Sequence, residues 1–413
     1  MNRPGGIHLL TLGQFAISGL GLLGYLSLGG GLVVLGMLGA AQGGLPANQR
    51  FTFIYLAWTI GALSLLIIPS LVISFLRLID RPLPTWQLPH SLYIASLLML
   101  MWPVVLLVGS LAEKVSWSWA VMPPLQIVAV VVPLWWFWEL GRRALPRLST
   151  QRSWAMVSYG LVISPPFIIA VELVVLLVAV SVFVLWLSGN PDLMRQLMAI
   201  AQRMAAGQAD PESLGRLLTP LIQQPVAIYS LLALVAGVIP VLEEFLKPVA
   251  VWFLLGRNIT PAEGFQAGML CGLTFGLVET LGNLSTPLGS AWTVLVIGRM
   301  TTGLLHMVST GLIGWGLASA WSQAKYARLA ACFIISASLH GLWNGLSVIM
   351  GVTPEILPSN LTGFLSFANR LGPVVPVALV VLAVAMFSLL LMLNHHLVST
   401  QPAAPEAVPA LES

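Results

Sequence analysis

Charged residues are scarce in this chain: 8% of its 413 residues are Asp, Glu, Lys or Arg, whereas 58% are hydrophobic. A soluble globular protein carries about 25% charged residues, so most of the surface of this chain cannot face water. The net charge of +4 does not indicate nucleic-acid binding, because the Arg residues lie between the apolar runs and form no single patch. The composition predicts an integral membrane protein in contact with the lipid bilayer, with no nucleic-acid partner.

Cysteine and aspartate are also rare. Both cysteines, Cys271 and Cys332, fall inside apolar runs, which excludes a disulfide framework and favours packing roles over nucleophilic ones. All three aspartates, Asp80, Asp192 and Asp210, lie outside the apolar runs, so a paired-aspartate intramembrane protease is excluded. The chain contains no HExxH and no GxSxG motif, which argues against zincin-like and serine-type sites.

Ten apolar runs have the roughly 20 residues that a helix needs to cross a membrane. They lie at 9–40, 51–76, 88–111, 117–138, 156–188, 226–255, 264–282, 291–319, 327–351 and 371–394. They predict an all-α polytopic bundle of about ten transmembrane helices, or nine if the first run is re-entrant. Prolines inside the runs, such as Pro165-Pro166 and Pro240, predict kinks.

The distribution of basic residues predicts the orientation, because cytoplasmic connections are enriched in Lys and Arg. The connections that follow the second, fourth, sixth and eighth runs are the even-numbered ones. They carry the unbalanced basic residues, which are Arg77, Arg81, Arg142, Arg143, Arg147, Arg152, Arg257, Lys325 and Arg328. The odd-numbered connections are poorer in basic residues or balance them with acidic ones. The predicted topology therefore places both termini in the cytoplasm, in a multi-pass protein of the cell membrane.

The one long connection divides the chain. The predicted parts are five spans without an assigned function (1–188), an amphipathic extracytoplasmic connection (189–224), a membrane core (225–351), the last span (352–400) and a disordered tail (401–413). In the connection, Leu193, Leu197, Ile200 and Met204 share a helical face, and Asp210-Pro211 is typical of the start of a second short helix. Such a pair either lies on the membrane surface or forms a lid over a site below it.

Ionisable residues inside the apolar runs indicate function, because a charge at the bilayer centre costs a few kcal/mol or more. They are Glu172, Glu243, Glu244, Lys247, Glu279, Arg299, His306 and His340, and all but Glu172 lie within 226–351. At about 1.5 Å per residue, the acidic and imidazole groups of these four spans lie roughly 20–22 Å from the cytoplasmic ends of their helices. They are predicted to meet in one layer, whereas Glu172 can either pair with Arg299 or contribute to catalysis.

Residue spacing places these groups on shared helical faces. The pairs are Glu243 with Lys247, Glu279 with Asn283, Arg299 with His306, and His340 with Asn344. Gly268, Gly272 and Gly276 form a stripe of small residues beside Glu279, which permits close approach of a neighbouring helix. The polar layer is therefore expected at a tight junction of several helices.

Carboxylates and imidazoles remain as the groups that can act on an amide bond. A Glu in a low-dielectric environment can act as general base on water, while His and Asn can stabilise the oxyanion. Alternatively, two His and a Glu can bind zinc while another Glu acts as base. The sequence does not separate the metal-free mechanism from the zinc mechanism, and it does not say whether Glu243 or Glu244 is the base.

Four segments, in order, resemble motifs of the PrsW family of intramembrane proteases. The run Glu243-Glu244-Phe-Leu-Lys247 resembles its EExxK motif, and the glycine-rich run 264–279 resembles the second motif, which ends in Phe-x-x-x-Glu. The runs 299–306 and 340–344 resemble the third and fourth motifs. The resemblance covers about 240–347, and the motif order is similar to that of the type II CAAX prenyl endopeptidases, in a superfamily described as glutamate-type or metal-dependent.

The chain departs from the family pattern after Glu279. Thr280 stands where the family usually has Asn, which leaves the hydrogen bonding around the carboxylate open, with Asn283 as a substitute.

The resemblance implies an intramembrane endopeptidase that hydrolyses membrane-embedded or membrane-anchored proteins through a Glu-activated water. It implies that 225–351 is the catalytic core, with Glu243, Glu244, Lys247, Glu279, Arg299, His306, His340 and Asn344 as catalytic residues. Glu243 or Glu244 would activate water, and His306, His340 and Asn344 would bind the oxyanion or a metal. Glu279 would position water or a ligand, while Lys247 and Arg299 would keep the carboxylates charged.

Zinc is one expected cofactor, with His306, His340, Glu244 and Glu279 as candidate ligands, and a metal-free glutamate mechanism is the other expectation. Two further functions could use the same buried layer. One is a proton-coupled transporter, since Glu/His relays occur in such proteins. The other is a non-enzymatic membrane scaffold or chaperone.

Overall fold

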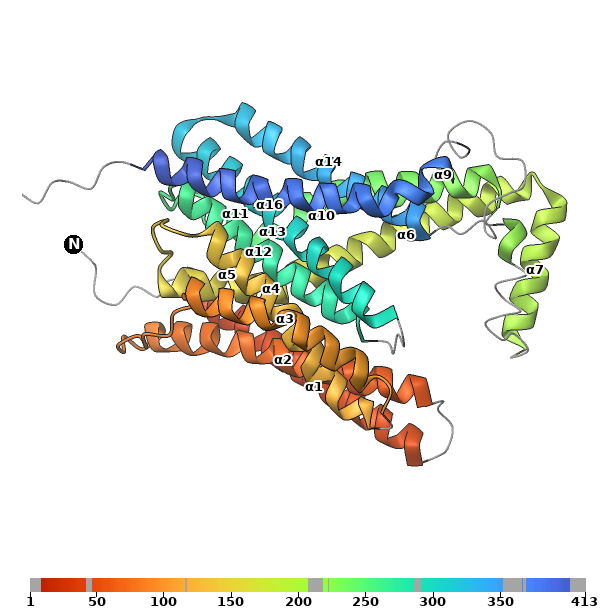
Figure 1. Ribbon diagram of the computed structural model, residues 1–413, viewed down its shortest axis with the longest axis horizontal. Helices are drawn as coiled ribbons and strands as arrows, with labels where there is room; N and C mark the ends of the chain where they lie inside the picture. Colours follow the sequence, from red (N-terminus) through yellow and green to blue (C-terminus); the bar gives the residue numbers. More distant parts are fainter. Residues whose placement is uncertain are drawn as a thin grey trace, which may run out of the picture.

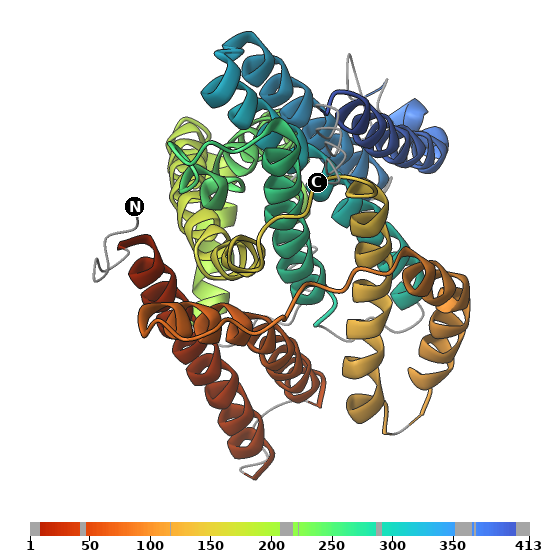
Figure 2. The same cartoon turned by 90° about the vertical axis from the view of Figure 1, so that its left-hand side faces the viewer.

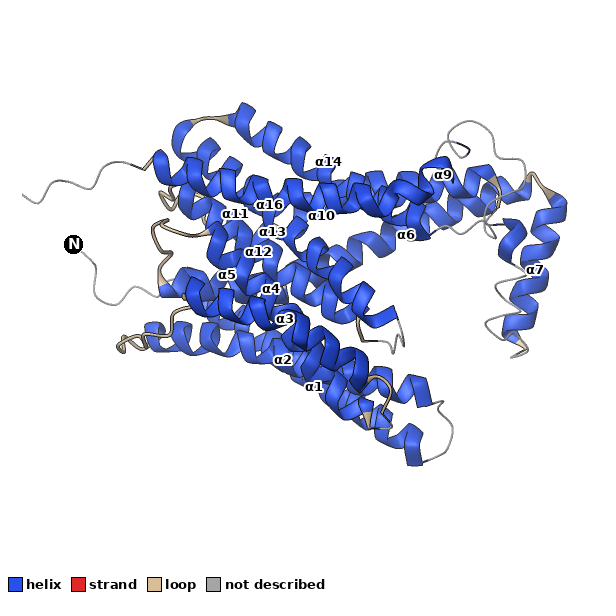
Figure 3. Ribbon diagram, viewed as in Figure 1, coloured by secondary structure: helices blue, strands red, loops and turns tan. Residues whose placement is uncertain are grey.

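The computed structural model describes residues 9–41, 47–115, 117–206, 218–221, 223–285, 291–351, 366 and 369–401. Within these residues every regular element is a helix, which confirms the predicted all-α bundle (Figure 3). The second short helix expected at Asp210-Pro211 and nearly all of the predicted tail lie outside the described residues.

The N-terminal half consists of two helical hairpins and an interrupted span (Figure 1). The hairpins are α1 (Leu9–Ala41) with α2 (Ala47–Leu78), and α3 (Leu92–Ala112) with α4 (Ser118–Gly141). The next run is divided into α5 (Thr150–Val162) and α6 (Ser164–Ser188). The predicted kink at Pro165-Pro166 is therefore a break between two helices, with both prolines in the first turn of α6, where a missing N–H is tolerated.

The C-terminal half contains the polar residues. Its helices are α7 (Pro191–Ala205), α9 (Pro225–Ala233), the π-helix η1 (Leu234–Val238), α10 (Ile239–Leu246), α11 (Val249–Trp252), α12 (Pro261–Asn283), α13 (Trp292–Gln323), α14 (Tyr326–Gly351), the 3₁₀ helix η3 (Gly372–Val374) and α16 (Val375–Ser399). Each predicted apolar run is helical, but the run 156–188 is divided between two helices and the run 226–255 among four. Eight segments of the described chain are long and apolar enough to cross a membrane, so the chain is a multi-pass membrane protein.

α12 and α13 have the length of a span but are not among those eight segments. Most of their residues are buried, and α12 packs between α13, α4 and α5 near the middle of the bundle (Figure 2). Because the other helices cover them, α12 and α13 can carry glycines and polar groups that a lipid-facing helix would avoid.

Backbone contact between α12 and α13 depends on glycine. A Cβ at Gly268 would lie 2.3 Å from the carbonyl oxygen of Thr310, and one at Gly272 would lie 2.1 Å from that of His306. Both distances are far below a normal van der Waals contact, so neither position accepts a larger residue without displacing the backbone. The predicted close approach along this stripe is confirmed, and it brings α12 directly onto the turn of α13 that carries His306.

The connections α2–α3, α4–α5, α11–α12 and α13–α14 gather at one end of the bundle, at the left of Figure 1 and facing the viewer in Figure 2. α1 begins and α16 ends at this same end. These are the connections that carry the unbalanced basic residues, so the predicted alternation is present in the fold. The assignment of this end to the cytoplasm stays a prediction.

α7 lies at the opposite end, across the direction of the bundle helices (Figure 1). Leu193, Leu197 and Ile200 pack in a small cluster with Leu187 of α6, and Ile200 is buried, as the predicted apolar face requires. Met204, predicted on the same face, is 58% exposed because it lies near the end of α7, outside this cluster. This orientation favours a helix lying on the membrane surface.

Candidate active site

The two adjacent glutamates follow a π-helical turn. In η1, the N–H of Ile239 bonds to the carbonyl of Leu234, five residues earlier. The next bond of that kind would run from residue 240 to Val235, but Pro240 has no N–H to donate. The irregular turn ends there, and α10 then places Glu243 and Glu244, both buried, in the middle of the bundle. Single π turns often occur at functional sites.

Asn344 satisfies the carbonyl that Pro240 leaves without a partner. Its side-chain Nδ2 donates to the carbonyl oxygen of Val235 at 3.1 Å. The sequence interpretation placed Asn344 among the oxyanion or metal ligands, but the structure turns its amide onto the π-helical turn. The reason is the backbone defect at Pro240, which requires a donor at this point.

Lys247 occupies the centre of the polar cluster and has no exposed side-chain surface. Its ammonium nitrogen lies 2.8 Å from Glu243 Oε2 and 2.8 Å from Glu244 Oε1. It also lies 2.9 Å from His306 Nδ1 and 3.3 Å from His340 Nδ1, so residues of α10, α13 and α14 meet at one atom. The predicted ion pair between Glu243 and Lys247 is present. The ammonium also lies 4.6 Å above the ring of Phe275, which adds a favourable cation–π contact.

His306 connects this centre to a second ion pair. Its Nε2 lies 2.6 Å from Glu279 Oε2, and Arg299 NH2 lies 2.7 Å from the same carboxylate oxygen. An ammonium can only donate, so the neutral ring that accepts from Lys247 at Nδ1 carries its proton on Nε2 and donates to Glu279. The carboxylate therefore fixes both the orientation and the tautomer of His306.

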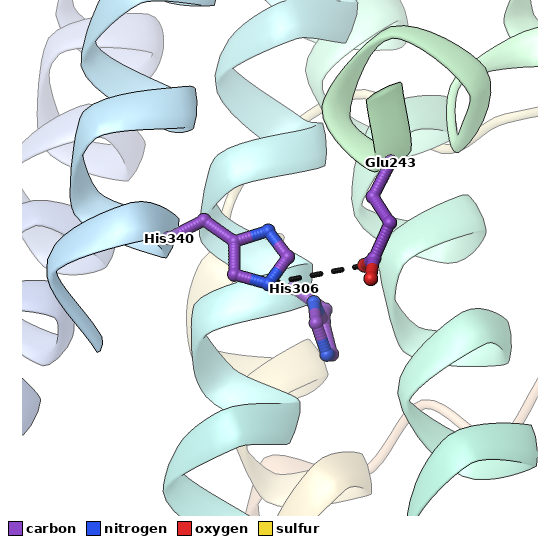
Figure 4. Close-up of side chains that lie close together, drawn as sticks. All are labelled: Glu243, His306 and His340. Atoms are coloured by element: carbon purple, nitrogen blue, oxygen red, sulfur yellow. Dashed lines mark ion pairs between the residues drawn. The ribbon is translucent and has the colours of Figure 1, made fainter. Parts of the chain in front are cut away.

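His340 completes the cluster from α14. Its Nδ1 lies 2.9 Å from Glu244 Oε1, and its Nε2 lies 3.8 Å from Glu243 Oε2. Figure 4 shows His306, His340 and Glu243 converging from three helices. The acidic and imidazole groups predicted to share one layer thus do meet, as one connected network of buried side chains.

Glu172 of α6 belongs to the same neighbourhood. Its carboxyl group lies close enough to Glu243, Glu279 and Lys247 to interact with all three electrostatically. Arg299, offered as its partner in the sequence interpretation, pairs with Glu279. Glu172 therefore adds a third carboxyl group to the neighbourhood of Glu243 and Glu244.

The residue that follows Glu279 takes no part in this network. Thr280 is buried, and its hydroxyl has no hydrogen-bond partner among the described residues. Asn283, the expected substitute for the missing family Asn, is exposed at the end of α12. The partners of the Glu279 carboxylate come from α13 instead.

The cluster has the chemistry of a metal site. Glu243, His306 and His340 each offer a ligand atom, and these atoms lie within 4.8 Å of one another. Oε2 of Glu243 and of Glu244 are buried and accept no hydrogen bond from the described residues, the 2.8 Å contact with Lys247 being an ion pair without hydrogen-bond alignment. Two His and one Glu are a common zinc donor set, so the residues fit zinc. Both predicted histidine ligands belong to this set, but the carboxylate beside them is Glu243 and not the predicted Glu244 or Glu279.

A divalent cation on these donors would compete with the Lys247 ammonium for the same atoms. The ammonium already supplies positive charge to both carboxylates, so the arrangement also suits a metal-free site. A deeply buried cation of either kind offsets the cost of placing two carboxylates in the membrane interior.

Residues 197–391 match the model of the PrsW family intramembrane metalloprotease. The resemblance to the PrsW family is therefore confirmed over this part of the chain. The match extends from α7 into α16, beyond the 240–347 region in which the motifs were recognised, and it includes every member of the polar cluster except Glu172. The comparisons with curated proteins and with solved structures return no match.

Proposed function

We propose that this chain, which matches the PrsW family over residues 197–391, is an endopeptidase of the cell membrane that cuts membrane-embedded or membrane-anchored proteins with a water activated by glutamate. The observation that carries the proposal is the buried cluster of Glu243, Glu244, Lys247, His306 and His340. The family match favours this activity over the transporter and the scaffold or chaperone. The match also includes residues on both sides of the four motifs, so the expectation of a protease no longer depends on the motifs alone.

The two adjacent glutamates have different tasks in this proposal. Glu243 belongs to the donor set with both imidazoles, which leaves Glu244 as the base. Glu244 takes a proton from water as the water oxygen bonds to the scissile carbonyl carbon, and it delivers that proton to the amide nitrogen as the C–N bond breaks. Zinc held by Glu243, His306 and His340 would lower the pKa of a bound water and polarise the carbonyl. Lys247 compensates the carboxylate charge throughout.

An apolar pocket supports a membrane-embedded substrate. The pocket has a volume of about 390 Å³, lies between α10–α11 and α13–α14, and has Glu244 among its lining residues. Its other walls include Phe245, Trp252 and Phe333. Apart from Glu244 these walls are almost entirely apolar, so a hydrophobic side chain of a transmembrane segment could occupy the pocket without losing hydrogen bonds to water.

Zinc content and cleavage, measured on the same purified samples, test the proposal. The full-length protein is reconstituted with a panel of fluorogenic single-span peptides, and bound zinc is counted by elemental analysis. Glu243→Gln should lose both zinc and cleavage, whereas Glu244→Gln should keep zinc and lose at least about 100-fold in cleavage rate. Glu113→Gln, which removes a carboxylate at the end of α3, is the matched control and should retain both.

Two results would change the proposal. Cleavage that survives in both Glu243→Gln and Glu244→Gln would remove these residues from the chemistry. Full cleavage by wild-type protein that contains no zinc and resists chelators would assign the reaction to the carboxylates and Lys247 alone.

A further inference from the structure

A separate cavity lined by arginines lies at the end of the bundle where the basic connections gather. Its volume is about 710 Å³, and it is formed by the start of α1, the end of α2, the start of α5 and the segment that follows α11. These four pieces come from both halves of the chain. None of the polar-cluster residues described above lines the cavity.

Three arginines face this cavity, and none of its described lining residues is acidic. Arg152 forms an ion pair with Glu263 at 2.9 Å. Within the described part of the chain, Arg77 and Arg257 have no ion-pair partner. The cavity therefore concentrates uncompensated positive charge from α2 and from the segment after α11.

Neutral hydrogen-bonding groups form the deeper part of the cavity. Gln14 and Thr11 of α1 are 3% and 6% exposed, and Gln151 of α5 donates to both of their side-chain oxygens. The ring of Tyr159 packs edge-on against Phe253 at 5.3 Å, and its hydroxyl has no hydrogen-bond partner among the described residues. Gln14 also donates one N–H to Ser70, so the groups that remain able to donate are the Thr11 hydroxyl, the second N–H of Gln14 and the Tyr159 hydroxyl. Together with arginines, such donors suit an anion with several acceptor oxygens.

The outer wall of the cavity is apolar. Leu9, Leu10 and Phe253 line it, and Leu9 is 80% exposed. A small inorganic anion gains nothing from such a wall, whereas a phospholipid places its acyl chains there and its headgroup among the arginines. Basic pockets between transmembrane helices at this level of a membrane protein are suited to anionic headgroups.

We infer that this cavity binds the headgroup of an anionic phospholipid, held by Arg77 and Arg257 with Thr11, Gln14 and Tyr159 as neutral partners. The lipid would connect α1, α2, α5 and the segment after α11. This site is separate from the proposed protease chemistry and does not depend on it.

The test titrates phosphatidylglycerol into delipidated full-length protein in a neutral detergent and counts bound lipid by native mass spectrometry. The double variant Arg77→Gln/Arg257→Gln should bind phosphatidylglycerol about 30-fold more weakly than wild type. Arg81→Gln/Arg143→Gln removes the same charge from exposed arginines of neighbouring connections that do not line the cavity. This control should bind as wild type does.

Tyr159→Phe gives an independent reading, because it removes one hydroxyl and keeps the ring against Phe253. It should weaken binding several-fold and leave the unfolding temperature without lipid unchanged. Equal binding of phosphatidylcholine, equal losses in the two double variants, or no loss in Arg77→Gln/Arg257→Gln would overturn the inference. Displacement of the bound lipid by millimolar inorganic phosphate would show that the cavity binds a free anion and not a phospholipid.

Discussion

Lys247 is the residue on which the polar cluster depends most. An isolated ammonium in the membrane interior costs several kcal/mol, yet this side chain has no exposed surface. Two carboxylates and the Nδ1 atom of His306 lie within 2.9 Å of the ammonium, so its charge is compensated and it has acceptors for its N–H groups. A compact ammonium suits this position better than the planar, forked guanidinium of Arg would.

Glu279 is expected to act through His306. If His306 binds zinc in the donor set with Glu243 and His340, Glu279 is the carboxylate that orients the ring from its other nitrogen. Loss of such a partner typically weakens metal binding 10- to 100-fold. Glu279→Gln should therefore bind zinc about 10- to 100-fold more weakly, measured by competition with a chromophoric chelator, and Glu113→Gln should match wild type. Unchanged zinc affinity in Glu279→Gln would show that the carboxylate does not support a metal ligand.

Asn344 is predicted to stabilise the π-helical turn without taking part in the chemistry. Asn344→Ala leaves the Val235 carbonyl without a donor, which costs about 1–3 kcal/mol. Unfolding of the purified protein should show this loss, while cleavage per folded molecule should fall far less than in Glu244→Gln. Asn283→Ala, at an exposed position of α12, is the control. A loss of cleavage as deep as that of Glu244→Gln, with stability unchanged, would return Asn344 to the catalytic groups.

The sequence predicted the depth of the polar residues better than the direction of their side chains. Depth follows from the fixed rise of a helix, so the acidic and imidazole groups of four spans could be assigned to one layer from the sequence alone. The rotation of each helix about its axis depends on packing between helices, which a single sequence does not specify. For that reason the contact between Glu172 and Glu243 and the turn of Asn344 towards Val235 were not predicted.

At the scale of the helices, the crossing of α12 and α13 positions His306. The carbonyl of His306 would lie 2.1 Å from a Cβ at position 272, so a methyl group there forces the two backbones apart. Gly272→Ala should destabilise the protein by about 1–3 kcal/mol and reduce cleavage by displacing the imidazole. Denaturant titration and cleavage assays of the same sample measure both effects.

Gly282 and Gly298 provide matched controls on the same two helices, since a Cβ at either position meets nothing within 4 Å. Gly282→Ala and Gly298→Ala should leave stability and cleavage near the wild-type values. Destabilisation by Gly298→Ala equal to that of Gly272→Ala would mean that helix flexibility, and not the close crossing, explains the result.

The helices themselves were predictable because length and hydropathy specify a membrane span with little ambiguity. The form of the interruptions in these helices was harder to predict from the sequence. Pro240 predicted a kink, and the structure has a π-helical turn whose free carbonyl is satisfied from α14, a contact 109 residues away in sequence. Pro165-Pro166 gave a break between α5 and α6. Proline shows where a helix is disturbed, but the form of the disturbance depends on which distant side chain replaces the missing bond.

At the scale of the whole molecule, the end that carries the basic connections is predicted to face the cytoplasm. The chain allows a direct test, because its two cysteines, Cys271 and Cys332, are buried and should not react in the folded protein. Thr85→Cys introduces an exposed thiol in the α2–α3 connection, and Ser188→Cys introduces one at the end of α6 nearest to α7. Neither change alters the charge of a connection, so the topology signals stay intact.

A membrane-impermeant maleimide applied to intact cells should label Ser188→Cys and leave Thr85→Cys and the wild-type protein unlabelled. Inverted membrane vesicles should give the reverse pattern for the two variants. The even-numbered connections share one end of the bundle, so a single accessible thiol in that group orients the whole molecule. Labelling of Thr85→Cys in intact cells would place the arginine-lined cavity on the outer face, and the basic residues would then have failed as orientation signals.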